Sequence, residues 1–141
     1  MKKKYKIGYT TGVFDLFHIG HLNILKKAKE QCDFLIVGVS TDENVFNYKH
    51  KYPVIPYEER VAIVEAIKYV DKVVPQENMD KYLAWQLYHF DAIFHGDDWK
   101  GSTMYSDIEK KLSEVGCDMV FIPYTKGISS SMLTEKLKNN K

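Results

Sequence analysis

The sequence predicts an α/β protein built on a doubly wound, parallel sheet of about five strands flanked by helices. Two observations carry this prediction. Short apolar segments alternate along the chain with longer amphipathic segments, as expected for strands that alternate with helices. Residues 34–40 are almost continuously apolar, which is typical of a strand covered on both faces. Ligands of such sheets bind at the carboxyl ends of the strands where the strand order reverses, so functional side chains are expected directly after strands.

The first half of the chain predicts two strands and two helices. The strands are expected at residues 6–11 and 34–40. The helices are expected at residues 21–31 and 57–69, because each carries apolar residues three or four positions apart: Leu22, Leu25 and Ala28 in the first, and Val61, Val64 and Ile67 in the second. The polar segment 43–56, which is closed by two prolines, is expected to be a loop.

The second half of the chain predicts three more strands, each followed by a helix. The strands are expected at residues 72–75, 92–95 and 119–122, and the helices at residues 78–88, 104–115 and 130–138. Asn78 is expected to be the N-cap of its helix, because its side chain can accept from the first amides of the helix. The whole pattern predicts a Rossmann-like sheet in a single domain that spans residues 1–141.

The composition is that of an ordinary soluble domain. The 141 residues are 45% hydrophobic and 28% charged, and 20 basic against 19 acidic residues leave a formal charge of +1. This balance gives no support for bulk attraction to nucleic acid or to an anionic membrane. No apolar stretch approaches the roughly 20 residues of a membrane span, and the basic N-terminus lacks the apolar run of a signal peptide, so we expect a cytoplasmic protein. Cys32 and Cys117 are expected to be buried thiols rather than a disulfide or a metal site.

Polar residues gather after three of the predicted strands. They occupy residues 11–21 after the first strand, residues 96–99 after the fourth and residues 124–131 after the fifth. Because the carboxyl ends of parallel strands lie at one edge of a sheet, these three loops are expected to meet there. The sequence therefore places its candidate site at this edge.

His18 and His21 are the first candidates for chemistry at this edge. They lie three positions apart at the start of the predicted helix, so their side chains can point the same way. Gly20 between them lets a phosphate approach the backbone, and the helix N-terminus supplies N–H groups and partial positive charge. The imidazoles could then hydrogen-bond a triphosphate and stabilise charge during transfer. Two alternatives are half of a zinc site, which lacks a third ligand at metal spacing, and two incidental surface histidines.

Four segments carry a resemblance to a known family. Residues 12–21 resemble the signature of the HIGH-motif nucleotidyltransferases, especially the cytidylyltransferases. Residues 96–99 and residues 125–130 look like two further signatures of the glycerol-3-phosphate cytidylyltransferases, and residues 68–73 resemble their Arg-Tyr-Val-Asp-Glu-Val segment. The resemblance runs in the right order from about residue 5 to about residue 137, and so covers nearly the whole chain.

The resemblance implies a reaction and a role for each matched residue. A phosphate of the acceptor would attack the α-phosphorus of CTP in line and expel pyrophosphate, with Mg²⁺ required and no covalent enzyme intermediate. The implied catalytic residues are His18, His21, Asp15, Lys49 and Lys51. The implied nucleotide-binding residues are Thr11, Gly12, Val13, Phe14, Gly20, Asp97, Asp98, Trp99, Thr125, Gly127, Ile128, Ser129 and Ser130. The implied acceptor-binding residues are Arg60, Lys68 and Tyr124.

Several of these roles have a structural alternative. Asp15, which is expected to orient nearby groups or help to place Mg²⁺, could instead cap its loop. The basic residues at 49–51 match a family loop that closes over the triphosphate, but they could also be an ordinary solvated loop. Asp98 and Trp99 are candidates for base recognition, and could instead be an N-cap and a packing residue. The serines near residue 130 read as an N-cap cluster, which is compatible with phosphate binding.

Two positions depart from the family pattern. The glycerol-phosphate enzymes generally carry arginine where this chain has Lys68 and Tyr124, and both arginines are tied to phosphate binding. Lysine keeps the charge but loses the planar two-pronged donor, whereas tyrosine loses the charge. Lys126 stands where the family commonly has an acid, and Arg60 keeps a family arginine that either binds the acceptor or anchors its helix.

These departures bear on the acceptor rather than on the reaction. A glycerol-3-phosphate-like acceptor is favoured. The alternatives are another polyol phosphate, choline or ethanolamine phosphate, a phosphonate, or a phosphorylated amino-acid derivative such as glutamine phosphate, activated for cell-wall, capsule or lipid assembly. The resemblance also implies a homodimer, with residues 68–73 contributing to the interface.

Two further functional classes compete with this interpretation. An ATP-using adenylyltransferase of the same superfamily is disfavoured by the Gly-Asp-Asp-Trp segment at residues 96–99. A non-catalytic nucleotide-binding module is disfavoured because His18, His21 and the polar residues at 125–130 are all intact. Fold class alone cannot separate these possibilities, since doubly wound domains host many functions.

Overall fold

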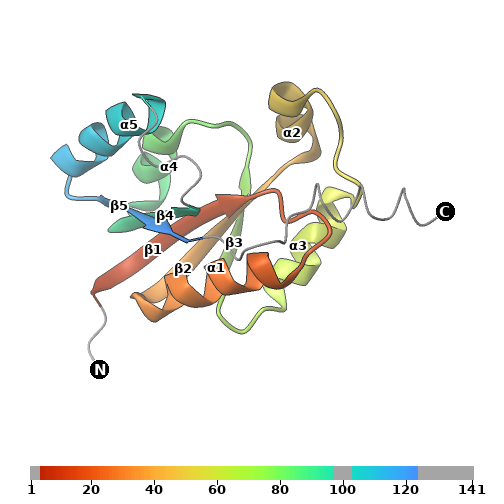
Figure 1. The fold of residues 1–141 in the computed structure, drawn as a ribbon, viewed down its shortest axis with the longest axis horizontal. Coiled ribbons are helices and arrows are strands. Elements are labelled where there is room, and N and C mark those ends of the chain that lie inside the picture. Colours follow the sequence, from red (N-terminus) through yellow and green to blue (C-terminus); the bar gives the residue numbers. More distant parts are fainter. Residues whose placement is uncertain (1–3, 97–102, 124–141) are drawn as a thin grey trace.

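The computed structural model describes residues 4–96 and 103–123, with the backbone alone for residues 103–105. The described strands are β1 (Tyr5–Gly12), β2 (Cys32–Ser40), β3 (Lys72–Gln76), β4 (Ala92–Gly96) and β5 (Asp118–Ile122). The described helices are α1 (Ile19–Glu30), α2 (Asp42–Lys49), α3 (Tyr57–Glu65), α4 (Lys81–Tyr88) and α5 (Thr103–Glu114). The strands form one sheet in the order β3-β2-β1-β4-β5, and every neighbouring pair is parallel (Figure 1).

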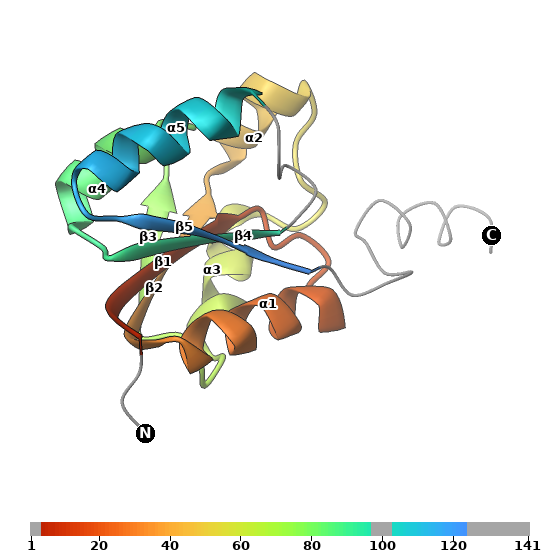
Figure 2. The same ribbon diagram turned by 60° about the vertical axis from the view of Figure 1, so that its left-hand side comes forward.

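The sheet separates two apolar clusters, as its alternating side chains require. Helices α1 and α3 cover one face, and α4 and α5 cover the other (Figure 2). The first cluster joins Leu25 of α1 and Val64 of α3 to sheet residues such as Val37. The second cluster joins Leu112 of α5 to Tyr9 and other sheet residues. This burial on both faces confirms the doubly wound parallel fold predicted from the apolar strand.

The strand order reverses at β1, and this reversal locates the candidate site. From β1 the chain moves outward through β2 to β3, then returns to the other side of β1 to add β4 and β5. The carboxyl ends of β1 and β4 therefore lie at the switch point where doubly wound sheets bind ligands. The loop that follows β1 ends at His18, and His21 lies in the first turn of α1.

The prediction of a loop over the whole of residues 43–56 is wrong, because helix α2 occupies Asp42–Lys49. Thr41 caps this helix, since its side chain accepts a hydrogen bond from the amide of Asn44, and two acidic residues in the first turn favour its N-terminus. The helix ends where His50 adopts the left-handed conformation, with a φ of 59°. Capping therefore stabilises a helix that has little apolar periodicity of its own.

Two helix boundaries also differ from the predictions. Helix α4 begins at Lys81, and its N-cap is Asp80, which accepts from the amide of Leu83 at 3.0 Å. Asn78 instead accepts from the amide of Asp80 at 2.9 Å, so it shapes the turn before the helix. Helix α3 ends at Glu65 rather than near residue 69, and the amides of Ala66 and Ile67 donate to carbonyls three residues back, as in a tightened last turn. The helix predicted at residues 130–138 lies outside the described residues.

The remaining expectations about the interior are confirmed. Cys32 and Cys117 are both buried, and no disulfide joins them. Burial raises the pKa of the Cys117 thiol to about 12, which keeps it protonated and unreactive. Among the described helices, none has the length and apolar character needed to cross a membrane.

Candidate active site

The loop between β1 and α1 has a tightly defined backbone. Phe14 and Leu16 adopt left-handed conformations, with φ angles of 56° and 49°. Phe14 is buried, and its ring lies against Gly12, where a Cβ would come within 3.0 Å of the Phe14 Cε2 atom. Glycine at position 12 therefore avoids a tight contact between a side chain and the Phe14 ring at the end of β1.

His18 and His21 cap helix α1 reciprocally. His18 is the N-cap residue, and its Nδ1 atom accepts from the amide of Gly20 at 3.0 Å. The Nδ1 atom of His21 in turn accepts from the amide of His18 at 3.1 Å, and the two ring centroids lie 4.0 Å apart. A neutral imidazole that accepts at Nδ1 carries its proton at Nε2. The capping box therefore fixes both tautomers and leaves two Nε2–H donors for a ligand.

Both histidines are neutral at pH 7. Burial lowers the pKa of His21 to about 4, with a smaller lowering from His18 and an opposing effect of Asp15. Burial also lowers the pKa of His18. Protonation of either ring at Nδ1 would turn a capping acceptor into a donor that faces an N–H group. The site thus offers neutral, oriented donors at a helix N-terminus, which suits phosphate oxygens.

Asp15 ties the β1–α1 loop to the segment that precedes α3. Its Oδ2 atom accepts from the amide of Val54 at 2.8 Å, and its Oδ1 atom accepts from the amide of Ile55 at 2.9 Å. These contacts match the loop-capping alternative for this residue. No group of three His, Cys, Asp or Glu side chains suited to a metal converges within the described residues. The engaged carboxylate does not fit a dedicated metal ligand, so we assign no Mg²⁺ contact to Asp15.

Arg60 is a buried anchor in this structure. Its side chain has no exposed surface. Its Nε atom donates to the carbonyl of Ile55 at 2.8 Å and its Nη1 atom donates to the carbonyl of Val13 at 2.7 Å. The guanidinium also donates to the carbonyl of Ser40 at 2.8 Å and to the carboxylate of Asp42 at 2.6 Å. The sequence left acceptor binding and anchoring open for Arg60, and these contacts are those of an anchor.

Lys49 and Lys51 lie at the turn that follows α2, and both are exposed. Phe46 and Tyr52 stack with ring centroids 4.7 Å apart, and this contact folds the turn back on the helix. Partial burial and the neighbouring Lys51 lower the pKa of Lys49, while the charge of Asp15 opposes the shift. The effect of the Asp15 charge on Lys49 shows that the lysine turn, residues 49–51, lies near the histidine loop, residues 13–21.

Comparison with known proteins identifies the family of this chain. The model of the cytidylyltransferase-like family matches residues 9–136. The chain belongs to the cytidylyltransferase-like family. It is 38% identical over 130 residues to the glycerol-3-phosphate cytidylyltransferase of Bacillus subtilis (strain 168), covering 91% of this chain and 94% of that protein. It is 35% identical over 130 residues to the enzyme of the same name from Staphylococcus aureus (strain NCTC 8325 / PS 47), covering 91% of this chain and 92% of that one.

A solved structure confirms the fold of this cytidylyltransferase-like chain. The lipopolysaccharide core biosynthesis protein from Thermoplasma volcanium GSS1 superposes with a TM-score of 0.72 at 27% identity. The superposition covers 88% of this chain and 99% of that one. The predicted family and the predicted fold class are therefore both confirmed.

Lys68 lies away from the histidines of its own chain. It lies between the end of α3 and the start of β3, and its ammonium group lies 5.3 Å from the ring centroid of Tyr69. Because β3 is parallel to its neighbours, its first residue lies at the amino edge of the sheet, opposite the histidines. The nearby Asp71 is fixed at that edge by an ion pair with Lys29 at the end of α1, at 2.5 Å. An acceptor contact by Lys68 would need a second copy of the chain.

Nine of the predicted site residues of this family member lie outside the described residues. They are Asp97, Asp98, Trp99, Tyr124, Thr125, Gly127, Ile128, Ser129 and Ser130. The strands that lead to them are described, and β4 ends at Gly96 and β5 at Ile122, paired with each other at the carboxyl edge. Their assignments stay predictions from the sequence.

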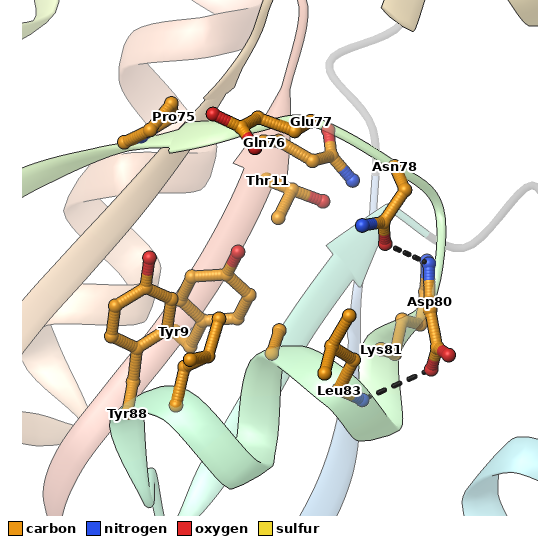
Figure 3. A pocket seen from close by; sticks show the side chains of 12 residues that line it. Tyr9, Thr11, Pro75, Gln76, Glu77, Asn78, Asp80, Lys81, Leu83 and Tyr88 are labelled. Carbon is orange, nitrogen blue, oxygen red and sulfur yellow. Dashed lines mark hydrogen bonds between the residues drawn. The ribbon is translucent and has the colours of Figure 1, made fainter.

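The structure adds a pocket that the sequence analysis missed. It has a volume of about 230 Å³ and lies between the ends of β1 and β3 and helix α4 (Figure 3). Aromatic lining comes from Tyr9 and Tyr88, and polar and charged lining comes from Thr11, Gln76, Glu77, Asn78, Asp80 and Lys81. Lys81 is only 6% exposed, and burial lowers the pKa of its ammonium group. Among the predicted site residues that the structure describes, Thr11, which the resemblance assigned to the nucleotide, lines this pocket.

A signal for the pocket was present in the sequence. Gln76, Glu77 and Asn78 follow β3, so they are also polar residues directly after a strand. The sequence analysis did not assign these three residues to the site, because the segments that resemble the family lie elsewhere in the chain. Lys81 gave no signal, since a lysine in a helix is usually exposed and its burial arises from packing.

Proposed function

We propose that this chain transfers CMP from CTP to a small phosphorylated acceptor, with a glycerol-3-phosphate-like acceptor favoured. The reciprocal cap of His18 and His21 is the observation that carries this proposal. It presents two neutral Nε2–H donors at a helix N-terminus, at the switch point of the sheet. The relatives named glycerol-3-phosphate cytidylyltransferases support the choice of CTP and of the acceptor.

The residues of the site support an in-line displacement. An oxygen of the acceptor phosphate forms a bond to the α-phosphorus of CTP, and the bond from that phosphorus to the bridging oxygen of pyrophosphate breaks. The Nε2–H groups of His18 and His21 donate to the phosphate oxygens on which negative charge accumulates. Lys49 and Lys51 supply positive charge from the neighbouring turn and favour departure of pyrophosphate. No side chain needs to act as a nucleophile, and the rate arises from positioning and charge stabilisation.

Magnesium is proposed to enter with the nucleotide. Mg²⁺ usually binds through substrate phosphates and one or two carboxylates, and it retains several waters. When bound, it would neutralise the triphosphate and assist departure of pyrophosphate. Within the described part of the chain the carboxylate of Asp15 is engaged by two amides, so the nucleotide itself is proposed to supply most ligands.

The pocket beside α4 is proposed to receive the acceptor. Its volume of about 230 Å³ suits a small molecule, and Lys81 places a positive charge in its wall. Thr11 connects the pocket to the site, because it is followed directly by Gly12 and the histidine loop. A polyol could hydrogen-bond Gln76 and Asn78, while Tyr9 and Tyr88 present aromatic rings to its carbon chain (Figure 3).

A homodimer is proposed as the working form. Lys68 lies at the amino edge of its own sheet, so a phosphate contact by this residue requires a partner subunit. The same residues 68–73 resemble the family segment assigned to the interface. We also propose that the enzyme works in the cytoplasm, where CTP is available, and that its CDP-linked product feeds cell-wall, capsule or lipid assembly.

Pyrophosphate release tests the proposed function. The protein is incubated with Mg²⁺, each nucleoside triphosphate in turn, and a panel of phosphates that includes glycerol 3-phosphate, choline phosphate and glutamine phosphate. We expect turnover with CTP and glycerol 3-phosphate. Turnover with ATP alone would identify an adenylyltransferase instead. Nucleotide binding without turnover on any acceptor would favour the non-catalytic module.

A further inference from the structure

The segment that follows the lysine turn is held against the histidine loop through both backbone groups of Ile55. The carboxylate of Asp15 accepts from the amide of Ile55 at 2.9 Å and from the amide of Val54 at 2.8 Å. Arg60 Nε donates to the carbonyl of the same Ile55 at 2.8 Å. The Nη1 atom of Arg60 then reaches back to the carbonyl of Val13 at 2.7 Å. Both side chains thus join the β1–α1 loop to the segment that follows the lysine turn.

The histidine loop needs such support because its backbone is strained. Asp15 lies between Phe14 and Leu16, which have φ angles of 56° and 49°. A left-handed conformation is unfavourable for a residue with a side chain, and it persists only where the surrounding contacts fix it. The hydrogen bonds at Val13 and Asp15 lie on either side of Phe14, and Asp15 directly precedes Leu16. Without these hydrogen bonds, the loop would lower its free energy by relaxing away from the observed conformation.

The supported segment begins directly after the lysine turn. Lys51 lies three residues before Val54, so the position of the lysines depends on where residues 54 and 55 are fastened. Arg60 also donates to the carbonyl of Ser40 and to Asp42, which fastens the other end of α2. Helix α2 and the turn are therefore held at both ends by groups that also hold the histidine loop.

We propose that Asp15 and Arg60 are positioning residues, which clamp the turn carrying Lys49 and Lys51 to the loop carrying His18 and His21. The clamp makes the two pairs of donors face one triphosphate. Asp15 thereby acts through the lysines and contacts neither substrate nor metal. The identity of the ligand rests on the proposed function, whereas the mechanical role of the clamp does not.

The first test measures coupling between Asp15 and the lysines. In the wild-type enzyme we expect Asp15→Ala to lower kcat/KM for CTP by about 10- to 100-fold. In the Lys49→Ala/Lys51→Ala background the same change should cost less than about threefold, because the lysines it positions are gone. Equal losses in the two backgrounds would overturn the proposal. Asp107→Ala, an exposed carboxylate on α5, is the matched control and should change neither value.

A Mg²⁺ titration separates positioning from metal binding. The Mg²⁺ concentration that gives half-maximal activity should be unchanged in Asp15→Ala, although the maximal rate falls. A tenfold increase in that concentration would assign Asp15 to the metal and overturn the proposal. Asp15→Asn should show an intermediate loss, because its amide keeps one accepting oxygen but turns an N–H group toward the second backbone amide.

A proteolysis test needs no activity, so it also works if the proposed function fails. Trypsin is added to the folded protein, and cleavage after Lys51 is followed by mass spectrometry. Lys51 is exposed and lies within the clamped turn. We expect Asp15→Ala and Arg60→Lys to be cleaved at least tenfold faster there, at a temperature where circular dichroism shows both to be folded. Cleavage of both folded variants at the wild-type rate would overturn the clamp.

Discussion

The hydroxyl of Tyr9 on β1 lies where the side chain of residue 38 on β2 would be. A Cβ atom on Gly38 would come within 2.6 Å of the Tyr9 Oη atom and 3.1 Å of the Thr11 Cγ2 atom. Tyr9 cannot easily move away, because its ring stacks on Phe90 with centroids 4.6 Å apart. Glycine at position 38 thus leaves room for the aromatic wall of the pocket beside α4.

Gly38→Ala is therefore expected to destabilise the protein by about 1–3 kcal/mol, as overpacking of a well-packed interior does. Tyr9→Phe removes the oxygen that the new methyl group would meet first, so the cost of Gly38→Ala should be smaller in that background. Urea unfolding of the two single variants and the double variant measures both values. An equal cost of Gly38→Ala with and without the hydroxyl would contradict the relationship.

The strands and the candidate edge were predictable because their signals are local. The apolar run of β2 and the alternation of strands with helices predict the parallel sheet. The polar residues that follow β1 indicate the edge of the sheet at which a ligand is expected. Helix α2 was missed because its stability comes from the Thr41 cap and not from an apolar stripe. The anchoring role of Arg60 could not be read from the sequence, since its acceptors are backbone carbonyls at positions 13, 40 and 55. Long-range contacts of this kind leave no pattern near the residue itself.

His18→Asn should separate the capping role of His18 from its chemical role. Asparagine is a strong N-cap, so the variant should keep the stability of helix α1, whereas His18→Ala should lose about 1 kcal/mol. Asparagine has no donor at the position of Nε2, so both variants should lose most of their pyrophosphate release. Thermal unfolding and turnover, measured on the same samples, provide the two readouts. Wild-type turnover in His18→Asn would rule out the proposed donor role.

The stability of the folded protein should fall between pH 6.5 and pH 4. An unfolded histidine takes up a proton near pH 6.5, whereas the folded protein holds the pKa of His21 at about 4 and that of buried His95 at about 3. The unfolded state therefore binds more protons in this range, and each such histidine contributes a slope of about 1.4 kcal/mol per pH unit. Chemical denaturation at a series of pH values gives the slope.

His21→Gln tests whether His21 is responsible for part of that slope. Glutamine at the third position of a helix completes a capping box with its side-chain oxygen, so the cap is retained while the titrating group is removed. The stability of this variant should fall less steeply below pH 6.5 than that of the wild-type protein. An unchanged slope would show that His21 is not held neutral in the folded state.

Lys81→Met should weaken binding of the acceptor and leave binding of CTP unchanged. The side chain lies in the wall of the pocket beside α4 and is almost fully buried, so its charge acts on a bound molecule with little screening by water. Methionine has a similar length and removes only the charge and the donors. We expect KM for the phosphorylated acceptor to increase at least tenfold in pyrophosphate-release assays, with KM for CTP within twofold of the wild-type value. Lys110→Met, on the exposed side of α5, is the control and should change neither constant. If KM for CTP increases instead, the pocket belongs to the nucleotide and the acceptor must be held elsewhere on the carboxyl edge of the sheet.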